Sequence, residues 1–140
     1  MRRRIGRLLW WVHRWTYTRT GGRFGGRIAG MPVLLLTTRG RRSGLPHTVP
    51  LTYFPEGKNL VVIASNGGAR RDPDWYANLR AHPVAWVQIT RRTVRVNGRD
   101  AGDDERKRLW IRVVQAYGGY ATYQKRTRRR IPVVVLEPDT

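Results

Sequence analysis

The apolar residues of this chain gather in short runs that glycine, proline and charged residues separate. Six of these runs have the length expected of a β-strand in a packed sheet. One of them, residues 93–97, alternates apolar and polar side chains, which is typical of a strand with one face toward solvent. The predicted strands span residues 33–38, 47–54, 60–65, 84–90, 93–97 and 131–136.

Two longer segments show helical patterns, and the first follows a glycine turn. The turn is predicted at Gly67 and Gly68, and the helix after it at a start where Asp72 is the N-cap and Pro73 takes the first helical position. This helix should end before His82, because a residue that precedes proline avoids the helical region.

The second helix is predicted to begin with Asp103 or Asp104 as its cap and to carry its apolar residues on one side. Two glycines, at positions 118 and 119, interrupt it. A short helical segment that holds Tyr120 and Tyr123 should follow.

The predicted order is three strands, a helix, two strands, a helix and a last strand. Strands and helices do not alternate regularly, which argues against a parallel sheet. Short strands joined mostly by hairpins predict the α+β class, with a small, mostly antiparallel barrel and two or three helices.

The segment before the first predicted strand has a different character. Residues 1–16 combine an apolar helical face, tryptophans and arginines, a pattern typical of a helix at a membrane interface. This segment is too short and too charged to span a bilayer, and a helix packed on the domain's own core would fit equally. Glycine and arginine dominate the rest up to residue 30, as in a linker. We therefore predict an N-terminal part, 1–30, and a folded domain, 31–140.

The composition is that of a globular domain, with 40% apolar and 10% aromatic residues. The chain has no cysteine, which excludes disulfides and thiolate chemistry. His13, His47 and His82 lie far apart and have no carboxylate clusters beside them, so no metal site is expected.

A formal net charge of +19 predicts an anionic partner. Nucleic acid, an anionic membrane surface and a small polyanionic ligand all satisfy that expectation. The aromatic residues gather in the N-terminal segment and at the predicted ligand pocket instead of along a basic groove, which argues against nucleic-acid binding.

Two stretches combine features of a ligand site. Residues 63–76 bring together a strand end, a glycine turn, a helix start and aromatic side chains, and this combination suits a flat anionic ligand. Between two predicted strands, Arg41 and Arg42 can bind phosphate or carboxylate groups, and Ser43 adds a hydroxyl donor. A simple capped loop and a solvated basic turn are the structural alternatives.

A third feature is the spacing of Tyr117, Tyr120 and Tyr123, which can place all three on one side of a helical segment beside a pocket. Packing in the core is the alternative for these tyrosines. The sequence shows no nucleophilic triad, and its carboxylates pair only at helix starts. An enzyme of this kind would let a cofactor carry the chemistry.

Three blocks of sequence resemble the deazaflavin-dependent nitroreductase family of actinobacteria, which includes F420H2-dependent quinone reductases. The blocks are residues 32–44, residues 64–78 and residues 123–138. The resemblance implies a split β-barrel of the FMN-binding-like kind that binds reduced coenzyme F420. It also implies hydride transfer from this deazaflavin to a quinone or a nitroaromatic acceptor.

The resemblance also assigns roles to individual residues. The Gly-Arg-Arg-Ser-Gly turn at residues 40–44 would hold the phosphate and oligoglutamate tail of the coenzyme. The strand that follows this turn would run beside the coenzyme. The residues implied in catalysis are Ser65, Trp75, Tyr117, Tyr120 and Tyr123. The residues implied in coenzyme binding are Arg41, Arg42, Ser43, His47, Thr48, Val49, Pro50, Leu51, Thr52, Ile63, Ala64, Ser65, Asn66, Asp74, Trp75, Tyr76, Ala77, Asn78 and Tyr120.

Two alternatives stay open beside this interpretation. Related split barrels use FMN, so FMN is the alternative cofactor, and a non-catalytic basic binder of nucleic acid is a weaker one. We expect a cytoplasmic protein, with attachment to the inner face of the cell membrane through residues 1–16 as a further hypothesis.

Overall fold

The computed structural model describes residues 27–28 and 31–139 of the chain. The helix predicted over residues 1–16 lies outside this described part, as does most of the predicted linker. The division of the chain at residue 31 therefore stays a prediction, although a short strand at residues 27–28 pairs with the first long strand.

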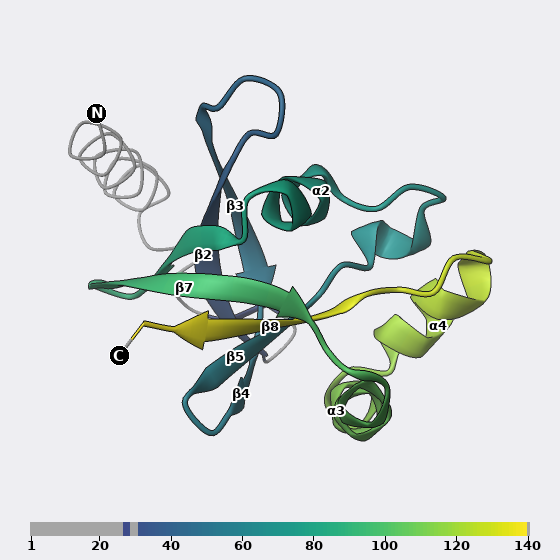
Figure 1. The fold of residues 1–140 in the computed structure, drawn as a ribbon. Helices are drawn as coiled ribbons and strands as arrows, with labels where there is room; N and C mark the ends of the chain where they lie inside the picture. Colours follow the sequence, from purple (N-terminus) through teal and green to yellow (C-terminus); the bar gives the residue numbers. More distant parts are fainter. Residues whose placement is uncertain (1–26, 29–30, 140) are drawn as a thin grey trace.

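Strands make up most of the described structure (Figure 1). They are β1 (Arg27–Ile28), β2 (Met31–Arg39), β3 (Pro46–Thr52), β4 (Phe54–Glu56), β5 (Asn59–Ile63), β6 (Val84–Ile89), β7 (Arg92–Asp100) and β8 (Val133–Pro138). The helices are the 3-10 helix η1 (Asn66–Gly68) and the α-helices α2 (Asp74–Ala81), α3 (Asp103–Ala116) and α4 (Gly119–Arg126).

All strand pairs are antiparallel, and the sheet runs in the order β1-β2-β6-β7-β8-β5-β4 with β3 paired to β2. Only Tyr53 separates β3 from β4. The chain therefore passes directly from a partner of β2 to a partner of β5, and this crossing joins the two ends of the sheet. The result is the mostly antiparallel split barrel that the sequence predicted.

Two apolar clusters fill the fold, one on each side of β8. Val134 and Leu136 face a cluster that holds residues of β2, β6 and α2, whereas Val133 and Val135 face a cluster that holds residues of α3 and α4. Because β8 is buried on both faces, its sequence is a continuous apolar run instead of an alternating one.

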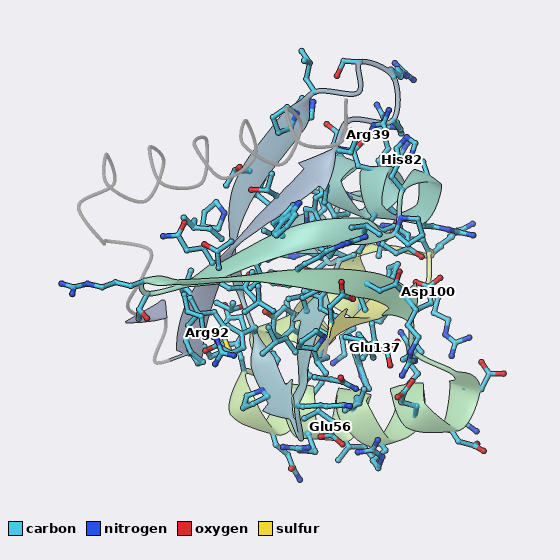
Figure 2. The ribbon with its side chains drawn as sticks, turned by 60° about the vertical axis from the view of Figure 1, so that its left-hand side comes forward. Arg39, Glu56, His82, Arg92, Asp100 and Glu137 are labelled. Atoms are coloured by element: carbon cyan, nitrogen blue, oxygen red, sulfur yellow. The ribbon has the colours of Figure 1, made fainter. Side chains whose placement is uncertain are left out.

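The helices dock on the barrel through specific contacts. A Cβ on Gly98 of β7 would lie 2.4 Å from Leu79 Cδ2, so only glycine at this position lets α2 pack so closely. At the other side, Arg108 and Arg112 of α3 both donate to the carboxylate of Glu56 at the end of β4. Figure 2 labels Glu56. The hydrogen bond from Arg108 is the largest cause that holds the pKa of Glu56 below its ordinary value.

The helix starts correct two predictions. Helix α2 begins at Asp74 with Pro73 in the N-cap position, and the carboxylate of Asp72 pairs with Arg129 instead of capping the helix. Helix α3 is capped at Gly102, where the backbone N–H donates to Glu105 Oε1 at 3.1 Å. The partner of Asp72 is distant in sequence, whereas the contact between Gly102 and Glu105 is a local capping box.

Strand boundaries also shifted, while the interrupted second helix was confirmed. Strand β5 ends at Ile63, β7 extends to Asp100, and β8 starts at Val133. Pro132 precedes β8 and has no N–H to donate, although its carbonyl still accepts from Ala64 N at 3.0 Å.

Candidate functional site

The turn between β2 and β3 is anchored on helix α2. The backbone N–H of Arg41 and its Nη1 both donate to Asn78 Oδ1, at 3.1 and 2.9 Å. Arg41 Nη2 pairs with Asp74 Oδ1 at 3.2 Å, and Asn78 Nδ2 donates to Thr38 Oγ1 at 3.2 Å. The buried Asn78 side chain therefore joins β2, the turn and α2.

Ser43 of this turn and His47 of β3 fold over Gly40. A Cβ on Gly40 would lie 2.6 Å from Ser43 Oγ and 2.8 Å from His47 Nε2. Ser43 Oγ also accepts from Leu45 N at 3.1 Å. Ser43 thus holds the turn in shape, and Arg42 extends from it as an exposed side chain.

The strand after the turn presents its predicted coenzyme contacts on two faces. Val49 and Leu51 pack against the barrel core, while His47 and Pro50 are exposed. Thr48 Oγ1 lies 2.6 Å from Thr37 Oγ1. Because side chains alternate along a strand, His47, Val49 and Leu51 lie on one face and Thr48, Pro50 and Thr52 on the other, so the predicted contacts cannot all face one ligand.

The glycine turn predicted after β5 is present, and its backbone is left-handed. Gly67 and Gly68 have φ values of 64° and 82°, and Asn66 precedes them at 47°. No atom lies within 4 Å of a Cβ built on Gly67, whereas one built on Gly68 would lie 2.8 Å from Tyr123 O of α4. Gly67 thus borders open space, and Gly68 lets α4 approach the loop.

Arg129 holds this loop in place. Its guanidinium donates to Ser65 O at 2.6 Å, Ala69 O at 2.9 Å and Ala64 O at 3.2 Å. It also pairs with Asp72 at 2.8 Å, and its side chain is only 15% exposed. One arginine therefore binds three carbonyls and a carboxylate of the segment predicted to border the coenzyme.

The sequence offered no signal for this role of Arg129. The residue lies in a run of three arginines, Arg128 to Arg130, and no local pattern distinguishes it from its two neighbours. Selecting the middle arginine requires the position of the carbonyls near Ser65, which only the fold supplies.

The three tyrosines form one cluster. Their ring centroids are 5.2 Å apart for Tyr117 and Tyr120, 6.0 Å for Tyr120 and Tyr123, and 6.4 Å for Tyr117 and Tyr123. The Tyr120 hydroxyl lies 2.6 Å from Thr52 Oγ1, so two residues predicted for the same site meet across 68 positions of sequence. Tyr120 is 6% exposed, and burial raises the pKa of its hydroxyl.

Trp75 and Tyr76 both lie in the barrel core. They are 6% and 5% exposed, and their rings meet edge to face at 6.2 Å. The Tyr76 hydroxyl donates to Asp100 Oδ1 on β7 at 2.7 Å. Burial first, and then this bond, raise the pKa of Tyr76 to about 12. The hydroxyl is thus directed to β7, while the contact of Tyr76 with a coenzyme stays a prediction.

The remaining candidate residues lie on two of these elements. Ile63 and Ala64, at the end of β5, are buried, Ser65 is 9% exposed, and Ala77 on α2 is half-buried. The described structure therefore brings the candidates into two neighbourhoods, the turn on α2 and the tyrosine cluster beside the glycine loop. Helix α2 follows the glycine loop and contacts β2, so it connects the two.

Comparison with known proteins gives consistent matches over nearly the whole chain. The sequence model of the F420H(2)-dependent quinone reductase family matches residues 10–138. An F420H(2)-dependent quinone reductase of Mycobacterium tuberculosis (strain ATCC 25618 / H37Rv) is 39% identical over 140 residues, which cover 97% of this chain and 94% of that protein.

Solved structures agree with this match. The structure of an F420-H2-dependent reductase, FDR-A, is similar with a TM-score of 0.69 and 37% identity, covering 76% of this chain and 94% of that one. A domain-swapped dimer is similar with a TM-score of 0.70 and 34% identity, covering 89% of this chain and 98% of that one.

Proposed function

Because the chain belongs to the F420H(2)-dependent quinone reductase family, we propose that it transfers a hydride from reduced coenzyme F420 to a quinone. The observation that carries this proposal is the family match over residues 10–138, which includes both neighbourhoods of candidate residues. When bound, the reduced coenzyme supplies the hydride, and the quinone gains this hydride and a proton to become a hydroquinone.

The residues present fit such a coenzyme. An anionic tail requires exposed cationic donors, and Arg42 supplies one on a turn whose position Asn78 fixes. A flat ring requires a backbone without side chains, and the space beside Gly67 meets that need. The protein's contribution is therefore to bind, to orient two reactants and to exclude water.

The test of the proposal is the reoxidation of reduced F420 by menadione under anaerobic conditions, followed by the absorbance of oxidised F420. Turnover that depends on the protein supports the proposal. Binding of FMN in place of F420, with no quinone reduction, would be consistent with the split-barrel fold but would refute F420 as the cofactor.

The two arginines of the turn should have different roles in coenzyme binding. We expect Arg42→Ala to raise the Kd for F420 about ten- to hundredfold, because a hydrogen bond to a charged group contributes about 1.5–3 kcal/mol. Its unfolding temperature should stay unchanged, because the side chain is exposed. Fluorescence titration with F420 and a thermal scan measure the two quantities.

Arg41→Ala is the comparison for this prediction. Arg41 is engaged with Asn78 and Asp74, so its loss should lower stability as well as affinity. An unchanged Kd for Arg42→Ala would show that the coenzyme tail does not bind at this turn.

Tyr120 is the candidate for holding a proton near the acceptor. Its hydroxyl is protonated at neutral pH, as that of an ordinary tyrosine is, and burial raises its pKa further. Thr52 fixes the orientation of this hydroxyl. We expect Tyr120→Phe to lower kcat at least about tenfold, since general acids contribute larger factors than this. Quinone reduction at saturating F420 measures kcat.

Two controls accompany the Tyr120 prediction. The coenzyme Kd of Tyr120→Phe should stay within about twofold of the wild type, and Thr52→Val should lower kcat less than Tyr120→Phe does, since it retains the phenol. Unchanged turnover in Tyr120→Phe would show that the Tyr120 hydroxyl takes no part in the reaction.

We also propose two finer points. Nitroaromatic compounds are a second class of acceptor, which the same assay tests with a nitro compound in place of menadione.

The tryptophan-rich basic segment at residues 1–16 supports peripheral attachment to an anionic membrane. Within the described residues, no helix is long and apolar enough to cross a bilayer. Sedimentation with anionic vesicles tests the attachment, and failure to sediment would refute it.

A further inference from the structure

A cavity of about 490 Å³ opens beside the glycine loop, on the side where the chain leaves α4. Two segments that are distant in sequence form it, the loop after η1 and the connection from α4 to β8. Its lining residues are Arg70, Arg126, Thr127, Arg128 and Arg129. Figure 1 shows both segments at the right of the view, away from the β2–β3 turn at the top.

The walls of this cavity are fixed by hydrogen bonds. The backbone N–H of Arg129 donates to Thr127 Oγ1 at 3.3 Å, and the carbonyl of Arg129 accepts from Gln124 Nε2 at 2.8 Å. The Arg129 side chain joins this connection to the loop through three carbonyls. These hydrogen bonds hold the two segments that line the cavity in fixed positions relative to each other.

The charges around the cavity are not balanced. Every ionisable residue in the lining is an arginine, and Asp72 compensates only Arg129. Arg70, Arg126 and Arg128 are exposed and form no ion pair within the described part of the chain. Cations gathered without counter-charges create a local potential that attracts anions.

The shape of the cluster selects among anions. Planar guanidinium groups bind phosphate through two parallel hydrogen bonds, and such groups approach this cavity from two different segments. A phosphate offers several separate oxygens, which match the parallel N–H groups of more than one guanidinium, whereas a halide offers a single atom to all donors. A cavity of this volume also has room for more than one phosphate group.

We propose that the cavity at Arg70, Arg126 and Arg128 binds a phosphate group, at a site separate from the turn proposed for the coenzyme tail. The group belongs either to a small soluble phosphate compound or to the headgroup of a phospholipid. The guanidinium of Arg126 also lies 5.8 Å from the centroid of the Tyr123 ring, so a phosphate bound here would be next to the tyrosine cluster.

The test uses the full chain without coenzyme and inorganic pyrophosphate as the probe, titrated by calorimetry at fixed salt. The variants are Arg70→Glu and Arg128→Gln, and the matched control is Arg92→Glu, which changes the total charge as much as Arg70→Glu does. Arg92 is the first residue of β7, and this end of β7 lies at the left of the view in Figure 1, opposite α4 and the connection that follows it at the right. We expect Arg70→Glu to weaken pyrophosphate binding at least about tenfold and Arg92→Glu less than about twofold.

A second arm distinguishes the two sources of phosphate. Vesicles of phosphatidylglycerol and phosphatidylcholine are sedimented with each variant. A loss of vesicle binding in Arg70→Glu but not in Arg92→Glu assigns the site to lipid headgroups, whereas equal vesicle binding in both assigns it to soluble compounds.

Two results would overturn the proposal. Equal pyrophosphate affinity in the cavity variants and the Arg92 control would show that only the overall charge attracts the anion. A parallel loss of F420 affinity in Arg70→Glu would make the cavity part of the coenzyme site. Because the first titration omits F420 and quinone, its outcome is independent of the reductase activity.

Discussion

The Arg129→Met variant is expected to lose about 3 kcal/mol of unfolding free energy, because it removes hydrogen bonds from a charged group to three loop carbonyls, two of which are half-buried. The substitution preserves the apolar stem and removes the guanidinium. The carbonyls of Ala64, Ser65 and Ala69 then lose their donor, and Asp72 loses its partner. The unfolding temperature should fall by roughly 10 °C, measured by a thermal scan of the free protein.

The neighbouring residue provides the matched control. Arg128 has the same side chain but is exposed, so Arg128→Met should change the unfolding free energy by less than about 0.5 kcal/mol. Arg129→Lys should fall between the two, because one ammonium cannot reach four acceptors in the plane of a guanidinium. Equal stability of Arg129→Met and Arg128→Met would contradict the role of Arg129 in holding the loop.

The barrel could be predicted from the sequence because its strands carry strong local signals. The run at β8 was continuous because two apolar clusters cover its two faces, and the alternating run at β7 has residues on a wet face. The helix caps could not be predicted in the same way. Asp72 has the residue type and position of an N-cap, but its carboxylate instead accepts from Arg129, which is distant in sequence, at 2.8 Å.

The candidate site also has features that local sequence predicts and contacts that only the fold reveals. Local patterns predicted the basic turn, the glycine loop and the tyrosine segment, and the resemblance brought them to one site. The pairing of Thr52 with Tyr120 and the contact of Arg41 with Asn78 depend on how β3 and α2 lie in three dimensions. Periodicity and turn chemistry carry no information about such long-range contacts, so these details emerged only from the fold.

The two adjacent glycines of η1 should respond very differently to the same substitution. We expect Gly68→Ala to cost about 3 kcal/mol, the sum of a left-handed backbone and an overpacked contact. Its φ is 82°, and its new Cβ would lie 2.8 Å from the oxygen and 3.1 Å from the Cα of Tyr123. Backbone atoms cannot rotate away as a side chain does, so α4 must shift, and kcat/KM for the quinone should fall about a hundredfold.

Gly67→Ala isolates the backbone cost, because Gly67 has a similar φ of 64° but no atom within 4 Å of the new Cβ. We expect a loss of only about 1 kcal/mol and no shift of the tyrosines. If the ring of F420 lies over this open space, Gly67→Ala should raise the coenzyme Kd while the thermal scan stays close to the wild type. Equal losses of stability in the two variants would show that the contact between Gly68 and α4 carries no energy, and the tyrosine cluster would then owe its position to α3 and the core alone.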